Sequence, residues 1–137
     1  MSRVVAELIE LRTNDPGRIV RLEQIEKFRD GSGYQCVITV VSIRVSCSCP
    51  FFFDDVALSV AVPMLRDLAR GKEGSLTIKG QWEPDSLRID ANAMGHVRVS
   101  GELTERSGLD QRVEFAFRTD QTVLSPLAND LQRLLEA

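Results

Sequence analysis

The residues of this chain that could do chemistry are few and widely spaced. His96 is the only histidine, and histidine is the residue type that most often serves as a general base at neutral pH. It follows Gly95 in an expected turn, so we expect an exposed residue with a structural role. The sequence contains no Gly-x-Ser-x-Gly and no His-Glu-x-x-His motif. These observations argue against hydrolysis by a serine nucleophile or by a helix-borne zinc site.

Three cysteines, Cys36, Cys47 and Cys49, are an odd number and fit a reducing compartment better than a disulfide framework. A single residue separates Cys47 from Cys49, so they do not form a Cys-x-x-Cys redox motif. A zinc site built from the three would need a fourth ligand, and only His96 remains to offer nitrogen. We therefore expect buried thiols that pack as small apolar groups, and no metal or cofactor.

The best pair of adjacent carboxylates is Asp54 and Asp55. Neighbouring side chains on an extended segment point to opposite faces, so the two carboxylates converge only at a turn. We expect them in a solvated loop. Hydrolysis by carboxylates, or small-molecule binding in a pocket lined by a curved sheet, stays open as an alternative function.

Two groups of residues are candidates for contact with a protein partner. The first is three consecutive aromatic residues followed by two acids: Phe51, Phe52, Phe53, Asp54 and Asp55. In a strand, at least one of these aromatic rings faces outward, where it can anchor a partner. The second group lies on the expected polar face of the C-terminal strands and mixes both charges: Arg98, Glu102, Glu114 and Arg118. There we expect cross-strand ion pairs on a surface that could also recognise a partner.

Composition excludes several classes of protein. The 137 residues are 43% hydrophobic and 27% charged, which is typical of one globular domain, here expected to span residues 1–137. The net charge of -3 argues against nucleic-acid binding. No apolar run reaches the length of a membrane span, and an acid at Glu7 interrupts any signal-peptide core. We expect a cytoplasmic protein.

The sequence of the N-terminal half predicts β-strands. Residues 3–12 and 18–28 flank a Thr-Asn-Asp-Pro-Gly turn and predict a hairpin. Residues 34–47 predict one long strand, with a bulge or bend where the apolar phase slips between Val40 and Val41. Residues 50–55 are expected to be irregular.

The middle of the chain allows two interpretations. Alternating apolar residues over 56–62 favour a strand, and a helix over the same residues is the competing prediction. Because proline is favoured at the first position of a helix and disfavoured inside one, we predict that a helix begins at Pro63 and ends near Arg70, before Gly71.

The C-terminal half predicts four further strands, around residues 76–82, 87–93, 97–103 and 113–117. A leucine stripe then predicts a closing helix with Ser125 as N-cap and Pro126 at its first position, and residues 120–122 could add a turn before it. The fold class is therefore α+β. It is a mostly antiparallel sheet of about eight strands, curved or sandwich-like, with a short middle helix and a C-terminal helix.

Residues 56–137 contain a Gly-x-Leu strand, a Gly-x-Val-x-Val step, a Phe-x-Phe strand and a Thr-Asp-Gln-Thr turn before a leucine helix. The residues of these motifs are Gly74, Leu76, Gly95, Val97, Val99, Phe115, Phe117, Thr119, Asp120, Gln121, Thr122 and Leu124. With these motifs the C-terminal half resembles a group of small bacterial proteins that includes the WapI-type immunity proteins. The resemblance implies a cytoplasmic antidote to a contact-delivered toxin and no catalytic residues.

We thus expect a non-enzymatic interaction protein whose partner is a protein such as a toxin, with no nucleic acid and no membrane involved. The acidic balance of the chain would suit a basic toxin such as a nuclease. The alternatives are the small-molecule-binding module or carboxylate enzyme, and a structural homo-oligomer that associates through Phe51 to Phe53 and the edge of the first strand.

Overall fold

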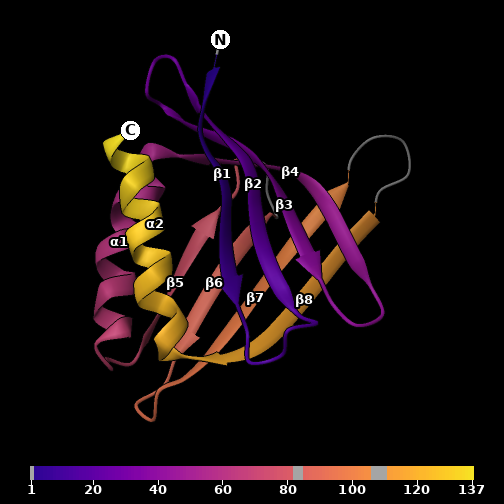
Figure 1. The fold of residues 1–137 in the computed structure, drawn as a ribbon, viewed down its shortest axis with the longest axis vertical. Helices are drawn as coiled ribbons and strands as arrows, with labels where there is room; N and C mark the ends of the chain where they lie inside the picture. Colours follow the sequence, from indigo (N-terminus) through magenta and orange to yellow (C-terminus); the bar gives the residue numbers. More distant parts are fainter. Residues whose placement is uncertain (1, 82–84, 106–110) are drawn as a thin grey trace.

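The computed structural model describes residues 2–81, 85–105 and 111–137. Within them the chain forms two four-stranded antiparallel sheets and two α-helices (Figure 1). In chain order the elements are β1 (Ser2–Arg12), β2 (Ile19–Phe28), β3 (Gly33–Val41), β4 (Ser46–Asp54), α1 (Asp55–Ala69), β5 (Gly74–Lys79), β6 (Ser86–Ala91), β7 (His96–Glu105), β8 (Gln111–Asp120) and α2 (Leu124–Glu136). The expected α+β class, with antiparallel strands, a middle helix and a C-terminal helix, is confirmed.

Each sheet is a meander in which neighbours in sequence are neighbours in space. Sheet A has the order β1-β2-β3-β4 and sheet B the order β5-β6-β7-β8. Along β5, Leu76 and Ile78 are buried while Ser75 and Thr77 are exposed, the alternation expected of a sheet with one dry face. Trp82 and the expected turn at residues 107–108 lie outside the described residues.

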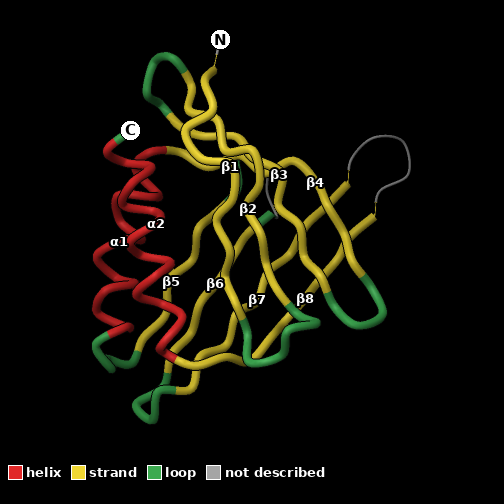
Figure 2. Tube along the Cα trace, in the orientation of Figure 1, coloured by secondary structure: helices red, strands yellow, loops and turns green. Residues whose placement is uncertain are grey.

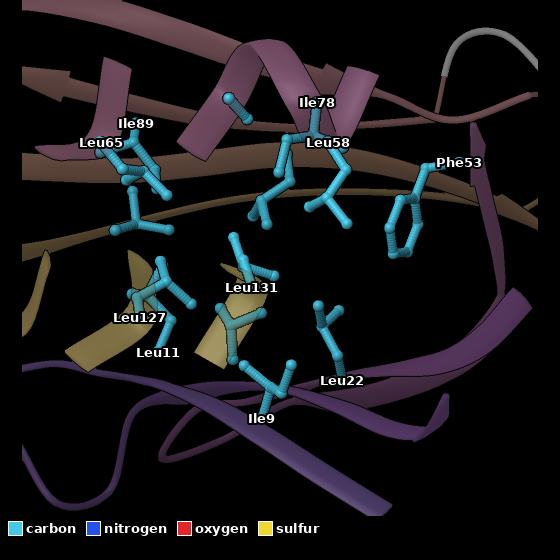
Figure 3. Packing of buried hydrophobic residues seen from close by; sticks show 14 of the residues in the cluster. Ile9, Leu11, Leu22, Phe53, Leu58, Leu65, Ile78, Ile89, Leu127 and Leu131 are labelled. Atoms are coloured by element: carbon cyan, nitrogen blue, oxygen red, sulfur yellow. The ribbon is translucent and has the colours of Figure 1, made fainter. Parts of the chain in front are cut away.

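One hydrophobic core joins the two sheets and the two helices. Figure 3 shows Ile9 and Leu22 of sheet A, Ile78 of sheet B, Leu65 of α1 and Leu131 of α2 meeting in the same interior. Helix α2 packs on β1, α1 packs on β5, and the helices pack on each other. Both helices thus close the same side of the two-sheet stack, the side bounded by edge strands β1 and β5 (Figure 2).

The prediction of one long strand over residues 34–47 was wrong. β3 ends at Val41, the amide of Ser42 donates to the carbonyl of Val45 at 2.9 Å, and the chain reverses into β4. The phase slip after Val40 therefore marks a hairpin turn and not a bulge. The sequence carries no turn signal here, because residues 42–45 include no glycine, proline, asparagine or aspartate. In addition, Ile43 and Val45 continue the apolar pattern of the strand although both are exposed.

The reversal also corrects the next segment. Residues 50–54, expected to be irregular, are the second half of β4, which pairs in register with β3 from Val37↔Pro50 to Gly33↔Asp54. The expected number of strands agrees with the structure, although one of them was placed at residues 56–62 and belongs at Ser46–Asp54.

Residues 56–62 are helical, so the strand prediction there was wrong. Helix α1 begins at Asp55, and the Asp54 side chain caps it by accepting a hydrogen bond from the amide of Ala57 at 2.6 Å. Pro63 lies inside the helix and not at its start. The free energy gained by burying the apolar side of the helix outweighs the cost of a proline in its interior. The buried residues recur at helical spacing: Leu58, Ala61, Val62, Leu65 and Leu68.

The C-terminal helix is confirmed, but its predicted cap is wrong. α2 begins at Leu124, so Ser125 lies inside its first turn and no side chain caps the helix. The extra turn over 120–122 is present as a 3-10 turn, Gln121–Val123, which the Asp120 side chain caps through the amide of Thr122 at 2.9 Å. The 3-10 turn leads directly into α2, so Asp120, and not Ser125, caps the start of this helical segment.

Tyr34 ties sheet A to both helices. Its side chain is fully buried, and its hydroxyl donates to the Asp55 carboxylate at 2.9 Å and lies 3.2 Å from the carbonyl oxygen of Leu134. Its ring stacks on Phe53 with 5.2 Å between centroids. Lys27 lies over the same ring and donates to the carbonyl of Ala137 at 3.0 Å. One tyrosine thus fixes the first residue of α1 and the last turn of α2 on sheet A.

Candidate partner-binding surfaces

The three consecutive phenylalanines alternate across β4. Phe51 and Phe53 point into the core and are 1% and 3% exposed, while Phe52 lies on the outer face of sheet A and is half-buried. One ring thus faces outward, as expected for a strand. A partner could reach Phe52 without unfolding the sheet, so the predicted aromatic contact narrows to this residue.

The two acids that follow the phenylalanines have different structural partners. Asp54 caps α1, and Asp55 accepts a hydrogen bond from the hydroxyl of Tyr34. The start of the helix, and not a solvated loop, sets their positions. Because each carboxylate is held by its own partner, this arrangement does not favour a carboxylate pair for hydrolysis.

The outer face of sheet A carries Phe52 within a regular grid, here called the sheet A face. Ladder register places two rows of four outward side chains across β1 to β4: Val4, Glu26, Gln35 and Phe52, then Leu8, Glu23, Val37 and Pro50. Sheet A lies in front of sheet B in Figure 1, with both helices to one side of it. Val4 is 57% and Leu8 is 49% exposed, so apolar side chains face solvent on this sheet.

A shallow depression of about 630 Å³ lies between β1 and β2 on this face. The β2 strand bulges there: register shifts between Glu23 and Glu26, and Gln24 adopts a positive φ of 50°. Four carboxylates and one cation are among the residues that line the depression: Glu7, Glu10, Glu23, Glu26 and Arg21. The sheet A face therefore combines exposed apolar side chains with a negative field.

The outward side chains of β5 to β8, the sheet B face, contain the second predicted group. Arg98, Glu102, Glu114 and Arg118 all lie on it, but like charges stand opposite each other: Arg98 faces Arg118, and Glu102 faces Glu114. The expected ion pairs between these four are thus absent from the part of the chain that the structure describes. The register that decides this could not be derived from the sequence.

Arg112, which sequence reasoning missed, offsets the repulsion between the carboxylates of Glu102 and Glu114. It contacts Glu102 at 3.2 Å and Glu114 at 3.0 Å. Arg98 and Arg118 make no ion pair with any described residue, so their exposed guanidinium groups are available on this face.

His96 is exposed at the start of β7, as expected, and lines an open hollow of about 870 Å³ with Asp90 and Arg118. The single Nε–H of Arg88 donates a bifurcated hydrogen bond to both oxygens of the Asp90 carboxylate, at 3.0 Å to each. The hollow therefore places His96 near an acid that is already bound by Arg88.

The thiols behave as packing groups. Cys36 is buried, and burial, with a smaller contribution from Cys49, raises the pKa of its thiol to about 12. Burial also raises the pKa of Cys47. Across residues 2–81, 85–105 and 111–137, no cluster of three or more His, Cys, Asp or Glu side chains is arranged to hold a metal ion. Likewise, no helix in these ranges is long and apolar enough to cross a membrane.

Val4 and Leu8 are surface candidates that sequence reasoning passed over. A signal for them exists: Ile9 and Leu11 are the buried pair of β1, and period two then places Leu8 on the opposite side. Val4 is exposed as well and pairs with Glu26 in the register of β1 and β2.

Comparison with known proteins adds one finding. The family model described as the Immunity protein WapI-like family matches residues 13–137, nearly the whole chain and not the C-terminal half alone. No curated protein sequence matches the chain.

Proposed function

Because the chain belongs to the WapI-like immunity protein family, we propose that it neutralises a toxin by binding it, in the cytoplasm of the bacterium that makes it and without catalysing a reaction. The family match over residues 13–137 carries this proposal. The three cysteines support the cytoplasmic placement, since all are free thiols.

The sheet A face is the surface that we assign to the toxin. Stable protein contacts need apolar or aromatic anchors surrounded by complementary polar groups. Leu8, Val4 and Phe52 supply the anchors, and the carboxylates around the β1–β2 depression supply the polar surround. Such a surface complements a basic protein, for example a nuclease whose active site attracts polyanions, and it would act by occlusion.

The sheet B face is the second candidate, and it predicts the opposite partner. Arg98 and Arg118 stand opposite each other on it, and neither forms an ion pair among the described residues, although Asp90 is the cross-strand neighbour of Arg98. This pair of guanidinium groups would attract an acidic surface. The two candidates can therefore be separated by charge as well as by position.

The test uses the purified chain and the purified product of each adjacent gene that is toxic on expression. Binding is measured by isothermal titration calorimetry, and protection by survival of cells that express both proteins. We expect a one-to-one complex. The double variant Leu8→Ser/Phe52→Ser should weaken it at least about 30-fold, since anchors of this kind contribute about 2 kcal/mol or more.

The matched control is Arg98→Ser/Arg118→Ser, which changes two exposed side chains on the opposite face. It should leave affinity within about threefold of wild type. Loss of binding in the control alone would move the contact to the sheet B face. Absence of any complex at micromolar concentration with every toxic neighbour would refute the proposed function.

A further inference from the structure

A groove of about 830 Å³ runs between helix α1 and edge strand β5, on a different part of the molecule from the sheet A face. One wall is an apolar stripe at i, i+4 and i+8 on α1: Val56, Val60 and Met64, which are 70%, 57% and 39% exposed. The other wall includes Ser75, Thr77 and Lys79 of β5. A helical stripe of this kind is normally covered in a folded protein.

The β5 wall presents unpaired backbone groups. β5 pairs with β6 alone, so it is an edge strand of sheet B. The amide of Gly80 donates to the carbonyl of Asp85 at 2.7 Å, which places Gly80 at a position whose backbone faces β6. Backbone groups alternate in direction along an antiparallel strand, so those of Ser75, Thr77 and Lys79 face away from β6, into the groove.

Gln81, the next residue along this edge whose backbone faces away from β6, already forms a hydrogen bond with an extended segment, strand β4. The outward amide of Gln81 donates to the carbonyl of Phe52 in β4 at 2.7 Å. The edge of sheet B is thus geometrically able to accept a further strand, and its remaining length, from Ser75 to Lys79, has no such partner among the described residues. An edge with free backbone groups beside an apolar stripe is a template for strand addition.

We propose that a second copy of this chain fills the groove. The two β5 strands would pair antiparallel about a twofold axis at Thr77, which would join two copies of sheet B, and the two α1 stripes would pack against each other. This inference does not rest on the toxin-binding function.

The surface is complementary to itself. With the axis at Thr77, each Ser75 stands opposite Lys79 of the other copy, so no like charges meet on the paired strands. A loop of four residues, 70–73, connects α1 to β5, so the two elements run antiparallel. A helix rises about 1.5 Å and a strand about 3.3 Å per residue, so Thr77 lies beside the part of α1 between Val60 and Met64. Across the twofold axis, Val60 of each copy would then meet Met64 of the other.

Charge favours the same arrangement. Antiparallel α1 helices bring the N-terminal end of one, with Asp54 and Asp55, toward the C-terminal end of the other. That end carries three cations and two carboxylates: Arg66, Arg70, Lys72, Asp67 and Glu73. Opposite ends of the two helix dipoles also meet.

Sedimentation equilibrium on the full chain tests the proposal. We expect a dimer at tens of micromolar. Val60→Asp should raise the dissociation constant at least about tenfold, since the new carboxylate would be desolvated in the interface. Val4→Asp is the matched control, because Val4 is also 57% exposed but lies on the sheet A face; it should leave the dimer intact. Circular dichroism confirms that each variant is folded.

The register is tested by disulfide trapping under mild oxidation. In an antiparallel pair that exchanges both hydrogen bonds, the Cα atoms are about 5.5 Å apart, within reach of a disulfide. Thr77→Cys should therefore cross-link two copies, whereas Ser75→Cys should not, because its equivalents lie on opposite sides of the axis. Equal cross-linking of both variants, or a wild-type chain that stays monomeric at about 0.5 mM, would overturn the proposal.

Discussion

Replacing Tyr34 by phenylalanine should remove one buried hydroxyl and leave the ring in place. The ring keeps its stacking on Phe53 and its contact with Lys27, so the loss is confined to the hydroxyl's contacts with Asp55 and Leu134. A hydrogen bond to a charged acceptor contributes about 1.5 to 3 kcal/mol. Because Asp55 is half-buried and can rehydrate, we expect a loss of about 1.5 to 2 kcal/mol.

For a chain of this length, that loss corresponds to a fall in Tm of about 5 to 7 °C. Urea unfolding followed by circular dichroism measures the free energy directly. The control is Thr39→Val, which removes a hydroxyl whose hydrogen bond to Ser48 is exposed; it should change stability by less than about 0.5 kcal/mol. An equal loss in both variants would refute the reasoning.

The pH dependence gives a second, independent check. Burial, followed by the hydrogen bond to Asp55, raises the pKa of Tyr34 above its ordinary value. A phenol whose pKa is raised on folding contributes stability that is fully present below pH about 10 and is lost as the pH rises through the folded pKa. The stability difference between wild type and Tyr34→Phe should therefore shrink above pH 10. Tyr34 is the only tyrosine, so tyrosinate absorbance reports its ionisation alone.

Three further changes test other parts of the fold. Pro63→Ala should stabilise the chain by about 1 to 2 kcal/mol in urea unfolding, because an interior helical proline costs about 3 kcal/mol and stiffens the unfolded chain by less; no gain would contradict this. Gly101→Ala should destabilise by at least about 2 kcal/mol, since its Cβ would lie 2.6 Å from the ring of Phe115; a Tm within 2 °C of wild type would count against it. Cys36 should resist Ellman's reagent in the native state and react only after unfolding, because its pKa is raised to about 12; labelling as fast as that of Cys47 would disprove its burial.

The C-terminal strands could be predicted from the sequence because their local signals agree. Turn residues such as Asn92 and Gly95 separate them, and Gly95 adopts a φ of 81° that favours glycine. The apolar residues between these turns recur with a period of two, which fits a strand and does not fit a helix. Local propensity and burial therefore point to the same structure.

The middle of the chain could not be predicted in this way because its signals conflict. Residues 56–62 alternate as a strand does, yet Leu58, Val62 and Leu65 also fit a helical stripe. Asp54 is a favourable N-cap for a helix over these residues, whereas Pro63 argues against one. Tertiary packing of the stripe, which sequence does not display, settles the matter.

The candidate surfaces were predictable as faces but not as arrangements of charge. Period two placed Arg98 and Arg118 on one side of the sheet correctly. Which residue stands opposite another depends on the register between β7 and β8, and that register cannot be derived from sequence alone. The contact of Arg112 with Glu102 on β7 was missed for the same reason, whereas Glu114 follows Arg112 by two residues on β8 and needs no register to be placed beside it.

The contact between α2 and β1 joins the last helix of the chain to its first strand, and this has a consequence for synthesis on the ribosome. In the part of the chain that the structure describes, each strand pairs with the preceding or following strand, so sheet A can assemble soon after its residues emerge. Its inner face near β1, however, waits for α2, which is translated some seventy residues later than β4. At about 5 to 20 residues per second, we expect that apolar surface to stay open for several seconds during synthesis.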